Sequence, residues 1–144
     1  MLRTCDSCGA VNRIPVARLV STGRCGRCKG ALGPSAAPID VADVATFDQI
    51  VREAQVPVLV DFWAAWCGPW RMDAPEVAQA AAAVAGRALV LKVDTERLPD
   101  LAARYRVQGI PNFIVFDRGK PVAQRAGAMR HTDLLRLVDG ARVA

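Results

Sequence analysis

The pattern of apolar and polar positions changes near residue 39. Beyond it, apolar residues gather in short runs of strand length and in longer stretches with helical periodicity. The nearly continuous apolar runs at 57–64 and 88–94 predict strands that are buried on both faces of a sheet. Residues 112–127 predict a β-hairpin that turns at Arg118–Gly119.

Helical stretches alternate with these strands. In the first, Phe47, Ile50 and Val51 share one face and Thr46 is the expected N-cap. The second ends at Gly86, a typical residue after the last helical turn, and contains Pro75, which is expected to kink it. The four stretches are 46–54, 75–86, 99–105 and 132–140. The order β-α-β-α-β-α-β-β-α predicts an α/β fold, with a central mixed sheet and helices on both faces.

The first 28 residues hold four of the five cysteines, in the pairs Cys5/Cys8 and Cys25/Cys28. Their C-x2-C-x16-C-x2-C spacing is typical of a zinc ribbon, in which four thiolates bind one structural Zn²⁺ ion tetrahedrally. Gly9 and Gly26 are expected to allow a tight turn at each pair, and the intervening segment 13–24 predicts a short strand pair. Because so small a segment buries little apolar surface, metal binding is expected to drive its folding.

The composition of residues 33–38, "GPSAAP", predicts a linker of small residues bounded by prolines. The chain is therefore expected to divide into a zinc ribbon at 1–32, the linker at 33–38 and an α/β domain at 39–144. No organic cofactor is expected.

Two structural disulfides are the alternative to a metal site. "MLRTCDSCGA" at the N-terminus lacks the apolar core of a secretory signal. No apolar run is long enough to span a membrane, because Asp61 and Arg87 interrupt the longest ones. The expected location is the cytoplasm, where thiols are kept reduced, which favours zinc.

The net charge of +5 comes entirely from residues 1–38, which hold six basic residues and one acidic residue. Such a basic segment suggests nucleic acid as a partner. However, four thiolates with one divalent cation reduce the excess to about +3. The segment also lacks aromatic residues on which bases stack, so the sequence disfavours nucleic-acid binding.

Four segments of the α/β domain, "VDFWAAWCGPW", "LKVD", "GIPNFIVF" and "AGA", resemble the thioredoxin family. The four-cysteine head before them resembles the zinc-containing bacterial branch of that family. The resemblance covers essentially the whole chain and implies the thioredoxin fold and exchange with protein disulfides. It also reveals one departure, because Trp70 occupies the position of the family's second active-site cysteine.

Cys67 is the candidate nucleophile. It follows a predicted strand and precedes a helix, whose unpaired N–H groups and dipole favour a thiolate. Trp66 is expected to form a wall of the site, and Gly68 to leave room for a substrate backbone. Pro69 suits the first helical turn, where a missing N–H costs nothing, and Trp70 adds apolar surface.

Asp61 and Lys92 are candidates for proton transfer. Asp61 lies in an apolar strand, where burial raises the pKa of an unpaired carboxylate. The resemblance implies that Asp61, assisted by Lys92, relays a proton for the second cysteine, which is absent here. Asp61 is then either a structural relic or a relay to an external thiol. The resemblance also implies a cis Ile110–Pro111 bond facing Cys67 and presenting backbone groups to a substrate peptide.

Three functions remain open. The first is exchange through Cys67 alone, forming a mixed disulfide that an external thiol resolves. The second is a redox-silent module that binds a peptide with Trp66, Trp70, Ile110 and Pro111. The third, if Trp70 is an artefact of the recorded sequence, is an ordinary dithiol reductase. The expected partners are protein disulfides and either a thioredoxin reductase or a low-molecular-weight thiol. No membrane partner is expected, and the chain is expected to be a monomer.

Overall fold

The computed structural model describes residues 1–66 and 68–143, without the side chains of residues 68–73 and 142–143. Its largest sheet has five strands in the order β5-β7-β6-β8-β9. β5, β7 and β6 are parallel, β8 runs antiparallel to β6, and β9 runs antiparallel to β8. The strands are β5 (Ile39–Asp40), β6 (Val58–Trp63), β7 (Leu89–Asp94), β8 (Asn112–Asp117) and β9 (Lys120–Ala126). The expected mixed sheet and element order are confirmed.

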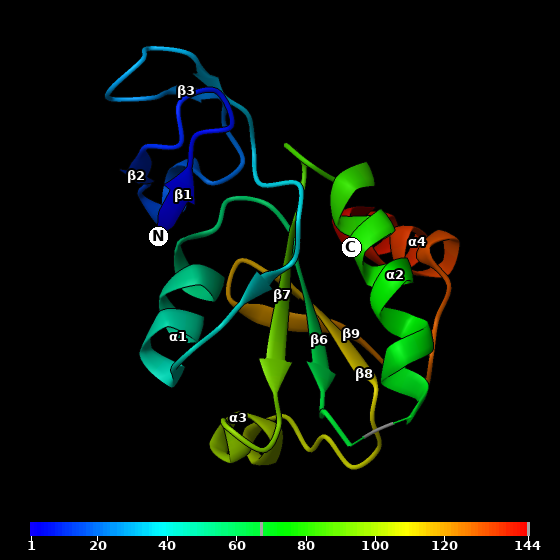
Figure 1. Cartoon of the computed structure of the whole chain (residues 1–144). Coiled ribbons are helices and arrows are strands. Elements are labelled where there is room, and N and C mark those ends of the chain that lie inside the picture. Colours follow the sequence, from blue (N-terminus) through cyan, green and yellow to red (C-terminus); the bar gives the residue numbers. More distant parts are fainter. Residues whose placement is uncertain (67, 144) are drawn as a thin grey trace.

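Four α-helices cover the two faces of this sheet (Figure 1). They are α1 (Val44–Glu53), α2 (Gly68–Ala83), α3 (Pro99–Arg104) and α4 (His131–Val143). One apolar cluster joins the sheet to α1 and α3, and a second joins it to α2 and α4. Successive strand residues alternate between the clusters, as Phe113 and Ile114 of β8 show. Both faces of the central strands are therefore buried.

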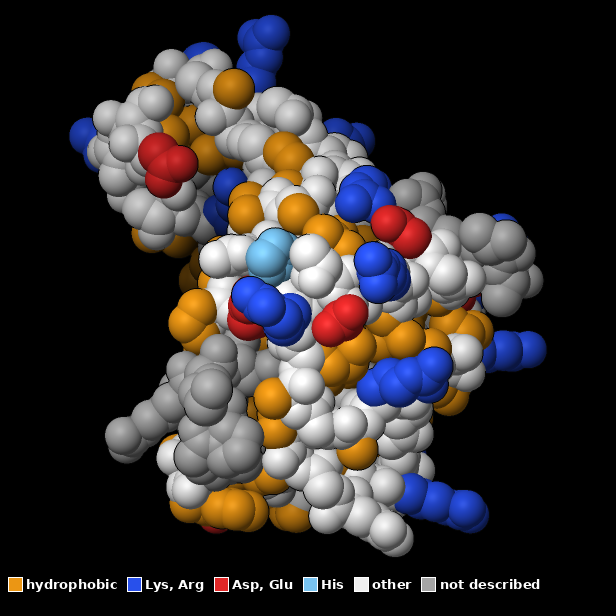
Figure 2. Space-filling model, turned by 90° about the vertical axis from the view of Figure 1, so that its right-hand side faces the viewer, with side chains coloured by type: hydrophobic (Ala, Val, Ile, Leu, Met, Phe, Trp, Pro, Cys, Tyr) orange, Lys and Arg blue, Asp and Glu red, His pale blue; other side chains and the backbone are white. Residues whose placement is uncertain are grey.

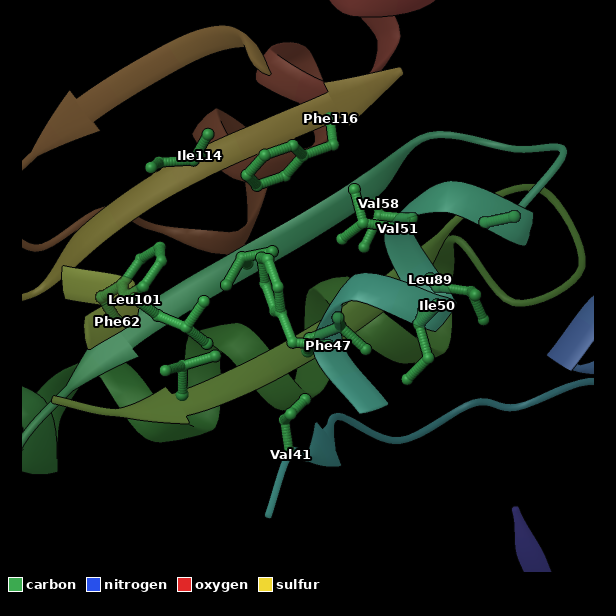
Figure 3. Packing of buried hydrophobic residues seen from close by; sticks show 14 of the residues in the cluster. Val41, Phe47, Ile50, Val51, Val58, Phe62, Leu89, Leu101, Ile114 and Phe116 are labelled. Carbon is green, nitrogen blue, oxygen red and sulfur yellow. The ribbon is translucent and has the colours of Figure 1, made fainter. Parts of the chain in front are cut away.

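The α1 face of the core is rich in aromatic contacts (Figure 3). Phe47 of α1 lies edge-on to Phe116 of β8, with ring centroids 5.7 Å apart. Tyr105, which follows α3, contacts the same Phe116 ring at 5.1 Å. Burying one large apolar side chain contributes about 1.5–3 kcal/mol, so this cluster holds α1 and α3 firmly on the sheet.

The helix boundaries differ by several residues from those expected, most clearly in α1 and α2. α1 begins before Thr46, because Asp43 is the N-cap and its carboxylate accepts a hydrogen bond from the Thr46 N–H at 2.7 Å. α2 contains Pro75, as expected, but ends at Ala83. Gly86 adopts a positive φ of 87° in the turn that follows.

The β8–β9 hairpin turns where the sequence predicts. Arg118 and Gly119 have φ values of 52° and 82°. Two consecutive positive φ values define the type I′ turn, whose twist matches that of the flanking strands.

The N-terminal segment, residues 1–32, consists of two small hairpins and a 3₁₀ helix. β1 (Leu2–Thr4) pairs with β2 (Val11–Arg13), and β3 (Gly23–Arg24) pairs with β4 (Ala31–Leu32). The strand pair expected within 13–24 is wrong, because each pairing closes around one cysteine turn. Between the hairpins Pro15 precedes the 3₁₀ helix η1 (Val16–Arg18), since its fixed φ suits a helix start better than a sheet.

The N-terminal segment packs against α1. Val16 and Leu19 are 7% and 1% exposed and belong to the apolar cluster that contains Phe47 and Ile50. The N–H of Ser35 donates to the Leu19 carbonyl at 2.8 Å. In Figure 1 the segment lies near α1, far from the end of β6 and the start of α2.

Candidate functional site

The connection between β6 and α2 carries the WCGPW motif. β6 ends at Trp63 and α2 begins at Gly68. Cys67 lies outside the described residues, and Pro69 and Trp70 are described only as backbone of the first turn of α2. Trp66, immediately before Cys67, has 68% of its surface exposed. The motif thus runs from the exposed Trp66 in the strand-to-helix connection into the first turn of α2.

Asp61 and Lys92 are neighbours on adjacent parallel strands. They pair in the register between β6 and β7. Asp61 is completely buried, whereas Lys92 is half-buried and its Nζ lies 5.0 Å from the centroid of the Trp63 ring. A cation above an indole face is attracted by the ring's quadrupole. The two candidates for proton transfer are therefore close together near the end of β6.

Pro111 lies at the same end of the sheet. The Ile110–Pro111 peptide bond is cis, as the resemblance implied. The next residue, Asn112, pairs with Phe62 of β6. The Pro111 carbonyl accepts a hydrogen bond from the Gly127 N–H at 2.8 Å, so the loop after β9 borders this region.

Gln124 is a residue at this end that the sequence reasoning missed. Its Nε2 donates to Oδ1 of the buried Asn112 at 3.1 Å and to the Tyr105 carbonyl at 3.3 Å. Hairpin counting from the turn places Gln124 on the opposite face of the sheet from Asn112. A β-bulge, described below, shifts the register by one residue and brings the two together.

The four N-terminal cysteines form a compact cluster. Their sulfur atoms all lie within 4.8 Å of one another. Two sulfur pairs, Cys5–Cys28 and Cys8–Cys25, are 3.7 and 3.6 Å apart. A tetrahedral zinc site with Zn–S bonds of about 2.3 Å has S···S edges of about 3.8 Å. The cluster therefore has the size of a four-thiolate metal site.

The two cysteine turns are built alike. The N–H of Gly9 donates to the Cys5 carbonyl at 2.9 Å, and that of Lys29 donates to the Cys25 carbonyl at 3.0 Å. Gly9 and Lys29 have positive φ values of 76° and 62°. The left-handed residue of the second turn is therefore Lys29, and Gly26 has no positive φ. Instead, the N–H of Gly26 donates to Oδ1 of Asn12 at 2.9 Å.

Hydrogen bonds to sulfur favour the thiolate form of Cys25 but are outweighed at Cys8. The backbone N–H of Cys28, then the Asn12 amide and the N–H of Arg27, lower the pKa of Cys25 to about 6. The N–H of Ala10 lowers the pKa of Cys8, but desolvation and the neighbouring sulfurs outweigh it and raise that pKa to about 11. Four ionised sulfurs this close require a cation between them, so the donor set fits a divalent metal.

Comparisons with known proteins identify both parts of the chain. Residues 38–140 match the thioredoxin family model, and residues 4–30 match the model of the thioredoxin 2 N-terminal zinc ribbon. The chain therefore belongs to the thioredoxin family. Thioredoxin C-3 of Corynebacterium nephridii is 37% identical over 139 residues, which are 96% of this chain and 94% of that relative.

Other relatives match the α/β domain. Thioredoxin 1 of Chlorobaculum tepidum is 44% identical over 62% of this chain and 88% of its own length. Among solved structures, a thioredoxin variant from Halobacterium salinarum has a TM-score of 0.69 at 30% identity, covering 78% of this chain and 96% of its own. Chloroplastic thioredoxin z has a TM-score of 0.68 at 26% identity over 75% and 96% of the two chains.

These matches confirm the predicted fold and zinc-ribbon head, and they support a thioredoxin-type thiol–disulfide oxidoreductase. The family implies protein disulfides as the substrate class. The four cysteines are positioned to bind a metal. Among the described helices, none is both long and apolar enough to cross a bilayer.

Proposed function

We propose that the chain exchanges protein disulfides through Cys67 alone. The observation that supports this most strongly is the distribution of thiols. Cys67 is the only cysteine of residues 39–144, and the other four cysteines cluster together within residues 1–32. Trp70, where the family has its second cysteine, has no nucleophile. A bound substrate sulfur therefore has no internal thiol to displace it.

The proposed reaction needs two equivalents of an external thiol. The Cys67 thiolate attacks one sulfur of the substrate disulfide; that bond breaks, a mixed disulfide forms, and the departing substrate thiolate takes up a proton. An external thiolate then attacks the Cys67 sulfur and releases the fully reduced substrate. A second one regenerates Cys67 and leaves as an oxidised dimer of the external thiol. The substrate gains two electrons, and the external thiols lose two.

We also propose roles for further residues. The proposed substrate-binding surface includes Trp66, which is 68% exposed. Its full set of residues is Trp66, Gly68, Pro69, Trp70, Ile110 and Pro111. Asp61 and Lys92, adjacent in the β6–β7 register, have two candidate roles: a relay of the proton from the incoming thiol, or a structural relic of the dithiol site. Asp61→Asn distinguishes them, because only a relay makes the pH profile of mixed-disulfide release depend on this residue.

The proposed head is a zinc ribbon at residues 1–32, followed by a linker at 33–38 and the thioredoxin-like domain at 39–144. Cys5, Cys8, Cys25 and Cys28 hold one structural Zn²⁺ ion. We propose a monomer located in the cytoplasm, with a low-molecular-weight thiol or a thioredoxin reductase as its electron source.

Trapping of the mixed disulfide tests the proposed nucleophile. The zinc-loaded chain is mixed with a peptide that contains one disulfide, quenched with acid and weighed by intact mass spectrometry. The expected product is one peptide adduct per chain, absent from Cys67→Ser. Adducts that persist in Cys67→Ser, or that form on the N-terminal cysteines instead, would contradict the proposal.

A redox-silent peptide-binding module is the second candidate. The exposed Trp66 favours it, because aromatic side chains are frequent anchors in binding interfaces. Alkylation of Cys67 separates the two functions. It abolishes partner capture if the thiol is required, and it leaves capture intact if only the apolar surface binds.

A further inference from the structure

We propose that a groove between β9 and α4 is a docking site for an acidic, apolar peptide segment of a partner protein. The groove has a volume of about 470 Å³. Val122, Ala123, Met129 and Leu137 provide its apolar lining, and Arg125, Arg136 and Asp133 its charges. None of these residues belongs to the WCGPW motif or to the cysteine cluster. The inference is therefore independent of the proposed thiol chemistry.

A β-bulge builds one wall of this α4–β9 groove. Phe116 of β8 pairs with Pro121 and Val115 pairs with Ala123, so Val122 is an extra residue in β9. In a regular strand, consecutive side chains point to opposite faces. At the bulge Val122 and Ala123 both line the groove, which is a known consequence of such an insertion.

The bulge also determines which way Arg125 points. Beyond Val122 the register is shifted by one residue, which pairs Arg125 with Phe113. Phe113 belongs to the apolar cluster on the α4 face. Without the extra residue, Arg125 would project from the opposite face. Val122 is 42% exposed, so the bulge leaves an apolar side chain and a cation accessible side by side.

Gly140 lies on the helical wall of the groove. A Cβ atom built there has nothing within 4 Å, so packing does not require glycine. Glycine inside a helix costs about 1 kcal/mol relative to alanine. The absence of a side chain does, however, leave room in the groove. Gly140 therefore lowers the stability of α4 but leaves the α4–β9 groove open.

The charges at the rim favour an acidic occupant. Arg125 and Arg136 are exposed and outnumber the single Asp133. The ion pairs found among the described residues involve neither arginine. Arg125 Nη1 donates to the Gln124 carbonyl at 3.0 Å, but the other guanidinium nitrogens of the two arginines can still donate to a carboxylate of the occupant. On the face shown in Figure 2, apolar and basic side chains lie next to each other.

The length and openness of the groove favour a peptide over an enclosed small ligand. Its helical wall runs from Asp133 to Gly140, two turns of α4 or about 10 Å. An extended chain rises about 3.3 Å per residue, so the wall matches about three residues. Exposed residues line most of it, whereas pockets for small molecules enclose most of the ligand surface.

A random nonapeptide library displayed on phage provides the probe. It is selected on the full zinc-loaded Cys67→Ser chain, so that no peptide is captured through a disulfide. The expected peptides combine aspartate or glutamate with large apolar residues. The affinity of a selected synthetic peptide is then measured by fluorescence polarisation. Gly140→Leu should weaken binding by about tenfold or more by filling the groove, and Arg136→Glu by about fivefold.

Matched controls carry the same changes elsewhere. Ala78→Leu adds a leucine to an exposed position of α2, and Arg52→Glu reverses an exposed charge on α1; both should preserve affinity within about twofold. Thermal melting checks folding, and Gly140→Ala replaces Gly140→Leu if the latter does not fold.

Three results would overturn the proposal. The first is a selection that yields no acidic apolar peptides. The second is binding that is insensitive to both Gly140→Leu and Arg136→Glu. The third is a concentration-dependent dimer in sedimentation that Gly140→Leu abolishes, because the occupant would then be a second copy of the chain.

Discussion

Residues 1–32 and residues 39–143 are stabilised in different ways. The larger part buries apolar side chains on both faces of its sheet, including Phe47 on one face and Phe113 on the other. The buried cluster of the N-terminal segment contains only Cys5, Cys25 and Leu32. Small domains with so little core usually depend on metals or disulfides. The interior of the N-terminal segment thus consists mainly of cysteines that can bind a metal, and not of apolar core residues.

The same comparison shows where the apolar residues of the N-terminal segment are used. Val16 and Leu19 are buried, but their neighbours belong to the core of the larger part. η1 lies between the two cysteine turns in the chain. The two cysteine turns therefore constrain both ends of the segment that contains Val16 and Leu19, the residues that attach residues 1–32 to the core. Metal binding is expected to stabilise this docking as well as the segment itself.

Metal removal should have the largest effect on the comparison. Zinc binding contributes about 10–16 kcal/mol to folding in zinc-finger peptides. A strong chelator should therefore unfold residues 1–32, while residues 39–143 keep a cooperative melt. Amide NMR spectra report the two parts separately. Cys25→Ser should have the same effect, with Ser21→Ala as the control. A head that stays folded after complete metal removal, checked by elemental analysis, would refute this account.

Two leucine substitutions compare the core with the docking contact. Leu101 is fully buried in α3, and Leu101→Ala should cost about 2–5 kcal/mol with or without metal. Leu19→Ala should cost about 2 kcal/mol in the zinc-loaded chain. After chelation this cost should vanish, because Leu19 has already left the core. Urea unfolding of residues 39–143 measures both, and an equal cost of Leu19→Ala in the two metal states would show that docking survives metal loss.

Glu76 should make the stability of residues 39–143 depend on pH, and this dependence should be the same with and without metal. Hydrogen bonding to the His131 side chain is the main cause that lowers the pKa of Glu76 below its ordinary 4.5. The Glu76 carboxylate accepts from or shares a proton with His131 Nδ1 at 2.8 Å, and it accepts from the His131 N–H at 3.4 Å. It thereby links α2 to the start of α4.

A carboxylate with a lowered pKa stabilises the fold above its unfolded-state pKa and loses this contribution as pH falls through its folded-state value. Glu76→Gln should therefore lower the melting temperature at pH 7. The difference from the parent should shrink as pH falls below about 4.5. Melting curves from pH 3 to 7 measure it; Gln79→Glu, an exposed change on α2, is the control. A constant difference across this range would exclude the carboxylate as the cause.

Substitutions at the left-handed residues of the two cysteine turns should change metal affinity in opposite directions, and these are the smallest effects expected. Gly9→Ala places a side chain at φ 76° and should lower metal affinity by about 1 kcal/mol. Lys29→Gly removes a side chain from φ 62° and should preserve or raise metal affinity. The loss of the hydrogen bond from Lys29 Nζ to the Gly26 carbonyl should offset part of this gain. Competition with a chromophoric chelator measures the affinities. Equal losses in the two variants would contradict the equivalence of the turns.

Much of the fold was predictable because its signals are local. Buried runs gave β6 and β7, and Arg118–Gly119 gave the hairpin turn, since each depends on a few adjacent residues. The bulge at Val122 was not predictable, because its register is determined by packing against β8 and α4. Because the sequence did not predict this bulge, it also did not predict the Gln124–Asn112 hydrogen bond or the α4–β9 groove.

The candidate sites were predictable to different degrees. The cysteine spacing sufficed for the cluster, since two ligands separated by only two residues in each pair leave little freedom. It did not reveal that Lys29 takes the left-handed position, because lysine rarely does. The docking of Leu19 was also missed, since no periodicity distinguishes a residue that packs outside its own segment.

Reduction of insulin disulfides, with dithiothreitol as the external thiol, tests the central claim most directly. The parent chain is compared with Trp70→Cys, which restores a second thiol, and with Cys67→Ser. The account predicts that the parent turns over at a rate proportional to thiol concentration and accumulates a mixed disulfide when thiol is scarce. Trp70→Cys should be faster at low thiol without this accumulation, and Cys67→Ser should be inactive. A parent chain with no adduct and no more activity than Cys67→Ser, beside an active Trp70→Cys, would contradict exchange through Cys67 alone.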